Sequence, residues 1–453
     1  MAAENIRDIV LSMLLTVEKE EAYSHLLVKD VLEKYDYLPG QEKAFLKRLF
    51  EGTLERRIEL DYYINQFASL PVRKMKPLIR NILRMSAYQI LFMDSVPDFA
   101  AINEAVKLTD KHKFHNLKGF VNGVLRKLSG GKETLKRPDK KNKVLYLSVT
   151  YSMPEWLVKH FLTEYSFEET EQIFAAFMQV RPVTMRFRLG LSDKEKEAVI
   201  RGMEEKGCVV EQHAFFPMAY YPKLQGIVAY YLKNCENVTE LPGFAEGLFT
   251  LQDVSSMEAV LSAGIKPGDK VLDICAAPGG KTVLAAELAT EKGQVLSRDV
   301  SEKKTVLIED YVNRMGLNNV TVEAADATVF DASLENTMDV VLADVPCSGL
   351  GVMGRKRDIR YRQKEEALME LPKLQKEIVK NAVRYVKPGG ILLYSTCTLN
   401  RAENEDMAAF IEKELLMKPV LKNTTAEKGY VRLTPHVQDT DGFFFARFRK
   451  EEK

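Results

Sequence analysis

Two cysteines and a carboxylate occur where a nucleophilic reaction could take place. Asp344 and Cys347 belong to the run Asp-Val-Pro-Cys-Ser-Gly, and Cys397 belongs to Ser-Thr-Cys-Thr. A thiolate is a strong nucleophile, whereas a buried cysteine usually serves as a small hydrophobic side chain, which is the better interpretation of either residue alone. Because both follow strand-like runs that would end at one edge of a sheet, the pair indicates thiol chemistry.

The stretch from Val271 to Thr282 predicts a ligand site at the same edge. An apolar strand-like run ends in Ala-Ala-Pro-Gly-Gly and continues into a helix, so small residues and free N–H groups of a helix start would face a ligand. Cys275 stands where a P-loop needs glycine, and Gly279 and Gly280 are adjacent, unlike the glycines of a dinucleotide site. A nucleoside-type cofactor remains, with an ordinary strand-to-helix turn as the alternative.

Acidic residues close three of the strand-like runs. Asp299 could accept hydrogen bonds from ribose hydroxyls, Asp326 could reach an adenine amino group, and Asp344 ends a further strand. A single aspartate at such a place is commonly a helix cap. Three at equivalent positions beside the glycine turn favour an adenosine-type ligand, which among doubly wound enzymes without the dinucleotide glycines points to methyltransferases.

The elements that would position these residues form a doubly wound parallel α/β sheet. Strand-like runs alternate with helical patterns and lie at Lys270 to Cys275, Gln294 to Asp299, Val320 to Ala324, Met338 to Asp344, Ile391 to Thr396, Tyr430 to Leu433 and Phe443 to Phe448. Such alternation predicts a sheet covered by helices, with ligands beyond the carboxyl ends of its strands. We assign it to residues 246–453.

The chain is long enough for two or three domains. Residues 1–140 show helical periodicity and predict an all-α domain. Residues 141–245 predict a helical linker and a small α+β module of the ferredoxin-like or RNA-recognition type. Six aromatic side chains of this module could stack on bases, although a core role is the commoner one: Phe215, Phe216, Tyr220, Tyr221, Tyr230 and Tyr231.

Charge is unevenly distributed in a chain whose net charge is only +1. Val106 to Lys143 holds twelve Lys/Arg against three Asp/Glu, and Arg355 to Lys364 holds six against Asp358 alone. A solvated helix face or linker is the plain alternative for the first cluster, but two basic clusters favour nucleic acid. Five widely spaced cysteines predict reduced thiols, and the absence of a long apolar run or secretory signal predicts a cytoplasmic protein without a membrane partner.

Four runs in the helical region resemble the NusB family of RNA-binding antitermination proteins. They are Ile82 to Gln89 (ILRMSAYQ), Val96-Pro97, Ala101 to Val106 (AINEAV) and Gly119 to Arg126 (GFVNGVLR). The resemblance covers nearly the whole first domain. It implies a NusB-like fold and an RNA-docking role, while the same helices could also act only as a packing module.

Seven segments of the second half resemble the RNA 5-methylcytosine methyltransferase family. They are Gln252-Asp253, Ala276 to Thr282, Asp326, Asp344 to Gly349, Tyr394 to Cys397, Glu403-Asn404-Glu405 and Asp441 to Phe444. DNA cytosine methyltransferases use the Pro-Cys cysteine as nucleophile and the RNA family uses the Thr-Cys one, so the presence of both indicates RNA. With the NusB-like domain, the resemblance implies a bacterial enzyme that acts on 16S ribosomal RNA.

The resemblance also implies roles for individual residues. Cys397 would be the nucleophile that attacks C6 of cytosine, Cys347 the thiol that assists its release, and Asp344 the group that provides a proton or hydrogen bond to N3. S-adenosylmethionine would be the cofactor, in contact with Cys275, Ala276, Ala277, Pro278, Gly279, Gly280, Lys281, Asp299, Lys304, Asp326 and Asp344. RNA contacts are expected at Arg188, Arg355, Lys356 and Arg357, and the basic segment from Arg355 to Lys364, beside Cys347 in the sequence, is expected to hold phosphates.

Some positions depart from the family pattern. Lys304 stands where arginine is usual and loses bidentate geometry, and Arg188 and Arg357 replace a usual Asn and Pro. Arg401-Ala402 replaces Pro-Glu, and we expect this to affect a helix start and not the thiol chemistry. We expect a monomer without metal that acts on free 16S rRNA or early assembly particles. A transfer RNA methyltransferase and a non-catalytic RNA-binding or assembly factor are the alternatives.

Overall fold

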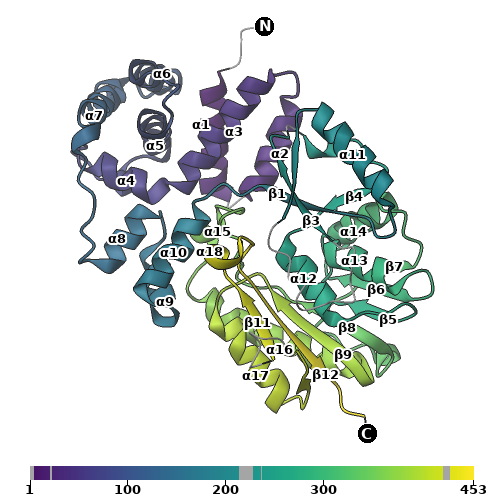
Figure 1. Cartoon of the computed structure of the whole chain (residues 1–453). Coiled ribbons are helices and arrows are strands. Elements are labelled where there is room, and N and C mark those ends of the chain that lie inside the picture. Colours follow the sequence, from purple (N-terminus) through teal and green to yellow (C-terminus); the bar gives the residue numbers. More distant parts are fainter. Residues whose placement is uncertain (1–4, 21–22, 214–227, 236, 422–428, 453) are drawn as a thin grey trace. The chain divides into compact units, whose positions relative to one another are not determined.

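The structure is a computed structural model that describes residues 5–20, 23–213, 228–235, 237–421 and 429–452. The chain forms two compact units, shown in Figure 1. The first unit comprises residues 1–178 together with 353–364, and the second comprises 179–352 together with 365–453. The sequence analysis drew boundaries near residues 140 and 245. In the structure, the helices of 143–177 lie in the first unit and the small sheet lies in the second.

The first unit is helical, as predicted. Its helices are α1 (Ile6–Glu20), α2 (Ser24–Lys34), α3 (Gly40–Glu55), α4 (Arg57–Asn65), α5 (Pro77–Phe92), α6 (Asp98–Lys111), α7 (Lys118–Gly130), α8 (Lys143–Thr150), α9 (Glu155–Glu164), α10 (Phe167–Phe177) and α15 (Ile359–Arg362). Helix α5 packs against α1, α3, α4, α6 and α7. Pro77 begins α5, where its missing N–H costs no hydrogen bond. Ile82, Leu83 and Met85 are fully buried, so α5 is the central helix of this core.

The second unit contains a small antiparallel sheet beside one helix. Its strands are β1 (Val183–Phe187), β2 (Val209–Gln212), β3 (Ala229–Lys233) and β4 (Phe249–Leu251), in the order β2-β3-β1-β4. Helix α11 (Asp193–Glu205) starts with a capping box in which Ser192 and Glu195 satisfy each other's backbone N–H groups. The predicted α+β module is therefore confirmed.

Two sequence expectations concern this small sheet. Tyr230 lies edge-on to Phe187 with ring centroids 5.4 Å apart, so it belongs to the core, and Tyr231 donates a hydrogen bond to Asp439. The other four aromatic side chains considered for base stacking, Phe215, Phe216, Tyr220 and Tyr221, lie outside the described residues.

A disulfide joins two of the five cysteines. The structure pairs Cys208 with Cys235, across 27 positions of the chain. The prediction of five reduced thiols is thus wrong for this pair, because the pairing of β2 with β3 brings the Cα atoms of two cysteines that are distant in sequence to 4.8 Å from each other. Cys275, Cys347 and Cys397 are free thiols.

The large sheet has the order β10-β12-β9-β8-β5-β6-β7, and β11 pairs with β12. Strands β5 to β9 run parallel, and β12 joins β9 antiparallel. The strands are β5 (Lys270–Asp273), β6 (Gln294–Asp299), β7 (Val320–Ala324), β8 (Met338–Asp344), β9 (Val386–Thr396), β10 (Lys418–Pro419), β11 (Tyr430–Leu433) and β12 (Phe443–Arg449). From β5 the chain winds outward to β6 and β7, and then restarts on the other side at β8. The boundary between the neighbouring strands β5 and β8 is therefore the switch point, at whose carboxyl end such sheets bind ligands.

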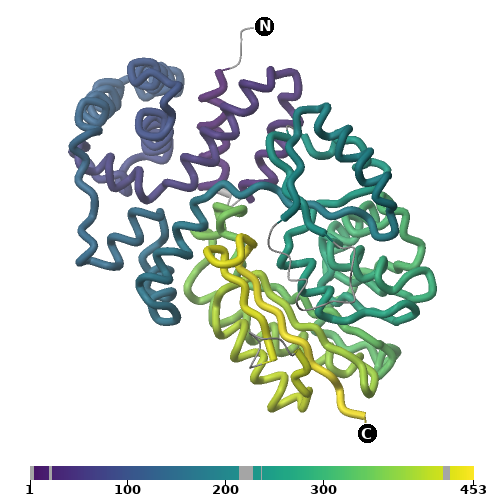
Figure 2. The backbone as a smooth tube through the Cα atoms, viewed as in Figure 1, coloured from purple at the N-terminus to yellow at the C-terminus, as the bar shows by residue number. Residues whose placement is uncertain are grey.

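Helices cover both faces of this sheet. They are α12 (Val254–Ala263), α13 (Gly280–Ala289), α14 (Glu302–Arg314), α16 (Ala367–Tyr385) and α17 (Glu405–Lys413), while the short α18 (Pro435–Gln438) lies in the connection between β11 and β12. Alternate residues of β8 enter different cores: Val340 packs with residues of α12 and α13, whereas Val341 packs with residues of α16 and α17. Figure 2 shows the backbone of β8, β9 and β12 side by side. The predicted doubly wound sheet is confirmed.

Candidate active site at the carboxyl edge of the large sheet

Strand register brings the two cysteines together. Asp344, the last residue of β8, lies opposite Ser395 near the end of β9. The chain turns after each strand, and the Sγ atoms of Cys347 and Cys397 lie 3.2 Å apart. The Gly351 N–H donates to the Cys397 carbonyl at 3.0 Å and closes the loop around both thiols. The sequence prediction that the two thiols share one edge is thereby met.

Asp344 lies between a cation and a hydroxyl. Lys281 Nζ donates to Asp344 Oδ2 at 2.7 Å, and Ser395 Oγ donates to Oδ1 at 2.7 Å. Burial lowers the pKa of Lys281, but the nearby Asp344 carboxylate outweighs it, so the pKa of the ammonium is raised overall. Lys281 therefore stays charged beside the thiols, where its positive charge favours a negative sulfur on Cys397.

The glycine turn joins β5 to α13. Gly279 is the N-cap of α13 and has φ +107°, a left-handed conformation that favours glycine. Gln252, which directly follows β4, donates from Nε2 to the Gly280 carbonyl at 3.1 Å and so ties the start of α13 to the end of the small sheet. Cys275 and Ala277 are half-buried, and Pro278 is exposed. Hydrogen bonds fix the turn from within, since the Ala276 N–H donates to the Arg298 carbonyl at 2.9 Å and the Gly279 N–H donates to the Ala276 carbonyl at 2.8 Å.

A buried carboxylate lies under this turn. Asp273 ends β5 and is fully buried, and its Oδ2 accepts from Thr282 Oγ1 at 2.7 Å while its Oδ1 has no hydrogen-bond partner. Burial raises the pKa of Asp273 to about 7. An unpaired buried carboxylate oxygen favours a ligand with an N–H or a positive charge. Asp273 was not among the predicted site residues, because the predicted strand ran on to Cys275 and so placed this acid inside the strand and not at its end.

The other predicted cofactor residues lie at the ends of β6 and β7. Asp299 is buried and accepts from the Ala277 N–H at 3.2 Å, and Lys304 Nζ lies 3.7 Å from Asp299 Oδ1. Asp326 is exposed, and hydrogen bonds from Thr328 lower the pKa of its carboxyl. The strand order β8-β5-β6-β7 therefore sets Asp344, Asp299 and Asp326 along one edge.

The pKa is raised for two of the three free thiols, Cys347 and Cys275. The hydrogen bond with Cys397, followed by burial, raises the pKa of Cys347 well above its ordinary value. Burial also raises the pKa of Cys275. At neutral pH, Cys347 therefore keeps its proton and can donate it as a hydrogen bond toward Cys397.

The basic segment Arg355 to Lys364 is used largely inside the helical unit. Arg357 pairs with Glu51 at 2.6 Å and with Glu55 at 3.0 Å. Arg360 is fully buried and donates to the carbonyl groups of Tyr151 and Met353 at 3.2 and 3.1 Å. The expectation that Arg357 contacts phosphate does not match these ion pairs, since two carboxylates already neutralise its charge.

The remaining residues expected to contact RNA are more accessible. Arg355 and Lys356 are exposed, whereas Arg188 is half-buried just after β1, where its N–H donates to the Leu248 carbonyl at 2.9 Å. Their contact with RNA stays a prediction.

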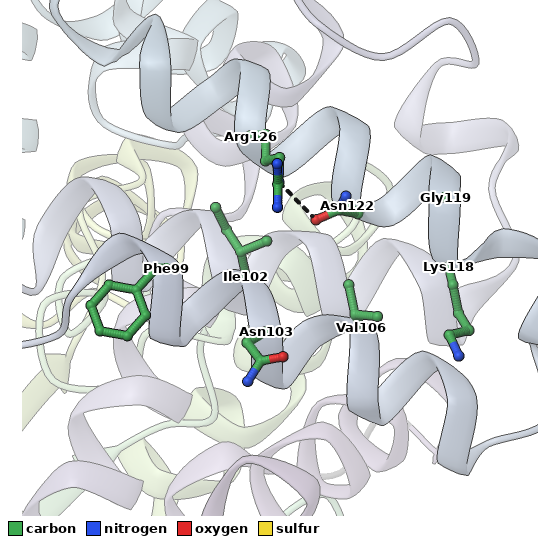
Figure 3. A pocket seen from close by; sticks show the side chains of 8 residues that line it. All are labelled: Phe99, Ile102, Asn103, Val106, Lys118, Gly119, Asn122 and Arg126. Atoms are coloured by element: carbon green, nitrogen blue, oxygen red, sulfur yellow. Dashed lines mark hydrogen bonds between the residues drawn. The ribbon is translucent and has the colours of Figure 1, made fainter.

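A surface pocket lies between α6 and α7 of the helical unit (Figure 3). Phe99 is 76% exposed there, and Arg126 Nε donates to Asn122 Oδ1 at 3.2 Å. The residues that line the pocket are Phe99, Ile102, Asn103, Val106, Lys118, Gly119, Asn122 and Arg126. None of these residues is acidic. An exposed ring beside amides and cations suits single-stranded RNA. The NusB-like runs Ala101 to Val106 and Gly119 to Arg126 supply most of these residues, but the sequence did not reveal that they line one pocket together with Phe99.

The part of the chain that the structure describes contains neither a cluster of metal-binding side chains nor a membrane-spanning helix. No group of three or more His, Cys, Asp or Glu side chains there could hold a metal ion. No helix there is long and apolar enough to span a membrane.

Known families match two separate parts of the chain. The family model for 16S rRNA methyltransferase RsmB/F matches residues 260–449, and the NusB family model matches residues 4–130. A crystal structure of PH0851 superimposes with a TM-score of 0.79 at 26% identity and covers 99% of this chain and 98% of that one.

Curated relatives extend the match to the whole chain. The probable ribosomal RNA small subunit methyltransferase B of Bacillus subtilis is 35% identical over 100% of both chains. The ribosomal RNA small subunit methyltransferase B of Serratia proteamaculans is 31% identical over 91% of this chain and 92% of its own. The chain therefore belongs to the ribosomal RNA small subunit methyltransferase B family, whose methyl-donating cofactor is S-adenosylmethionine.

Proposed function

We propose that this chain transfers a methyl group to C5 of a cytosine in 16S ribosomal RNA, through a covalent bond between Cys397 and C6 of the base. The observation that carries the proposal is the contact of two free thiols, 3.2 Å apart, at the switch point beside Asp344. An enzyme that methylated an exocyclic nitrogen or a ribose oxygen would have no use for a paired thiol here. C5 of cytosine, by contrast, needs a covalent partner.

Cytosine C5 is too weak a nucleophile to attack a methyl group directly. Attack of the Cys397 thiolate on C6 forms a carbon–sulfur bond and moves the electrons of the C5–C6 double bond toward C5. N3 must gain a proton or a strong hydrogen bond at the same time. Asp344 is the group assigned to N3: transiently protonated from solvent, it gives N3 the proton as the Cys397–C6 bond forms and takes it back when Cys397 leaves. Its Lys281 and Ser395 partners hold it in place at 2.7 Å each.

The two thiols have different tasks in this mechanism. While Cys397 is a free thiolate, its charge keeps the proton on Cys347, whose hydrogen bond in turn stabilises the thiolate. Once Cys397 is bonded to C6, that negative charge is gone, and Cys347 can lose its proton to solvent and accept the proton from C5. The C5–H electrons then restore the double bond, and Cys397 leaves as a thiolate.

The residues of the glycine turn fit the cofactor. S-adenosylmethionine supplies an electrophilic methyl group and carries two positive charges, at the sulfonium and the amino group. The unpaired Oδ1 of buried Asp273 suits a cationic group. Asp299 and Asp326 suit the ribose and adenine ends, and the small residues from Cys275 to Gly280 let the backbone approach.

We further assign the pocket between α6 and α7 to single-stranded RNA. Phe99 offers a ring for stacking, Asn103 and Asn122 offer amides to base edges, and Lys118 and Arg126 offer positive charge. The ion pair of Lys118 with Asp110 is exposed on both sides, so it costs little to exchange for a phosphate.

The test is methyl transfer from labelled S-adenosylmethionine to 16S rRNA that lacks 5-methylcytosine. Cys397→Ala should abolish incorporation and form no adduct. Cys347→Ala should accumulate a protein–RNA adduct that survives denaturation. An adduct with Cys397→Ala instead would reverse the roles. Label in transfer RNA but not 16S rRNA would change the substrate, and no label in any RNA would favour a non-catalytic binding factor.

A further inference from the structure

The turn that follows β9 holds both cysteine loops through two adjacent side chains. A single 3₁₀ turn, Arg401–Glu403, leads to Asn404, which is the N-cap of α17. Glu403 and Asn404 are both fully buried. Polar side chains with no access to water persist only where they have partners, and all of the partners described below lie in or beside the cysteine loops.

Asn404 holds the chain on both sides of Cys397. Its Oδ1 accepts from Thr396 Oγ1 at 2.6 Å, and its Nδ2 donates to the Thr398 carbonyl at 3.0 Å. Thr396 directly precedes Cys397 and Thr398 directly follows it. One planar amide therefore fixes the backbone that carries the nucleophilic sulfur.

Glu403 holds the chain on both sides of Cys347 in the same way. Its Oε2 accepts from the Ser348 N–H at 2.9 Å, and its Oε1 accepts from Ser348 Oγ at 2.5 Å. Gln375 Nε2 donates both to Glu403 Oε2 and to the Pro346 carbonyl, each at 2.9 Å. The carboxylate thus anchors Ser348 directly, and anchors Pro346 through Gln375.

Each carboxylate oxygen of Glu403 faces only donors. Ser348 Oγ and Asn400 Nδ2 donate to Oε1, and the Ser348 N–H and Gln375 Nε2 donate to Oε2. Glutamine at this position would keep the shape but point an NH₂ group at two donors. Aspartate in place of Asn404 would keep the Thr396 bond but point an oxygen at the Thr398 carbonyl. Both anchors can therefore be broken by isosteric changes.

The structure assigns Glu403 and Asn404 separate positioning roles: Asn404 orients Cys397 for formation of the RNA adduct, and Glu403 orients Cys347 for its release. This assignment rests on the proposed function. The assignment goes beyond the proposed function, because neither residue touches a reacting atom. It also gives two neighbouring residues opposite effects on one covalent intermediate: Asn404 promotes formation of the adduct and Glu403 promotes its release. The 2.7 Å contact between Ser348 Oγ and Thr398 Oγ1 keeps the two loops side by side while each has its own anchor.

The experiment compares Glu403→Gln and Asn404→Asp in the full chain, with 16S rRNA and S-adenosylmethionine. Turnover is measured by methyl incorporation, and adduct by a denaturing gel at several times after mixing. We expect each variant to lose at least about ten-fold in turnover, since small misplacements of reacting groups have such effects. Glu403→Gln should accumulate adduct, as Cys347→Ala does, whereas Asn404→Asp should form adduct at least about ten-fold more slowly. Adding Cys397→Ala to Glu403→Gln should remove the adduct.

The ratio of adduct to methylated RNA is the decisive measurement, because a general loosening of the active site would lower the amounts of both together. If both variants reduce adduct and turnover by the same factor, the separate roles are refuted while wild-type activity leaves the proposed function standing. If the wild-type protein does not methylate RNA and the Cys347→Ala variant forms no RNA adduct, the proposed function fails and this inference fails with it. Ser348→Ala and Thr396→Val each remove one hydrogen bond from the same anchors, and they test the same opposition of effects if an isosteric variant does not fold.

Discussion

Replacing Arg357 with methionine should destabilise the helical unit and leave RNA binding largely unchanged. The guanidinium lies 2.6 Å from Glu51 and 3.0 Å from Glu55, and the three side chains are only 19%, 28% and 12% exposed. Removing one partner of a buried ion pair costs about 3–5 kcal/mol, because it leaves uncompensated charge behind. Partial exposure of this cluster reduces the expected loss to about 2–4 kcal/mol.

Urea denaturation followed by far-ultraviolet circular dichroism would measure this loss as a shift of the midpoint of the helical unit. Lys356→Met is the matched control, because its side chain is an exposed neighbour, and it should change stability by less than about 0.5 kcal/mol. Adding Glu55→Gln to Arg357→Met should restore part of the loss. An Arg357→Met protein with wild-type stability, but with weaker RNA binding and a shallower salt dependence, would refute the reasoning and make Arg357 a phosphate contact.

Three further outcomes follow from other parts of the molecule. Gly279→Ala should weaken S-adenosylmethionine binding at least about ten-fold in calorimetry, because φ +107° disfavours a side chain and the turn must shift. Burial raises the pKa of Glu258 from 4.5 to about 8. The folded protein therefore favours the protonated side chain, whose contribution to stability is present at low pH and is lost as the pH rises from about 4.5 through 8. In denaturation curves, Glu258→Gln should gain stability relative to the wild type between pH 5 and 9. Phe99→Ala should raise KM for RNA about ten-fold with little change in kcat, as expected for loss of one stacked base.

Patterns local in sequence gave accurate predictions. The runs Gln294 to Asp299 and Val320 to Ala324 are strands with those bounds. Alternating apolar residues identify each strand, and an aspartate at or just after its last residue marks its carboxyl end. Strand β9 starts at Val386, five residues before the predicted Ile391. Lys-Pro-Gly-Gly looks like a turn, and only pairing with β8 shows that the strand extends through it.

Features that depend on distant partners escaped sequence analysis. Glu403 meets Ser348, 55 positions away, and Gln375, 28 positions away, so no local spacing reveals it. The neighbouring Arg401-Ala402 was expected to affect only a helix start. That expectation missed the contacts through which Glu403 and Asn404 of the same turn hold both cysteine loops. Charge density likewise could not distinguish an arginine paired with Glu51 and Glu55 from one that meets phosphate.

The helical unit is discontinuous in the chain, and this has a consequence for its synthesis. The side chains of Arg360 and Asp358 complete its interior, yet about two thirds of the second unit's residues lie between them and Met178 in the chain. A ribosome must therefore make Gln179–Val352 before the helical unit can close. A fragment that ends near residue 140 or 178 would lack Arg357 for Glu51 and Glu55, and Asp358 for Ser24. Chimeras between relatives should exchange residues 353–364 together with the helices.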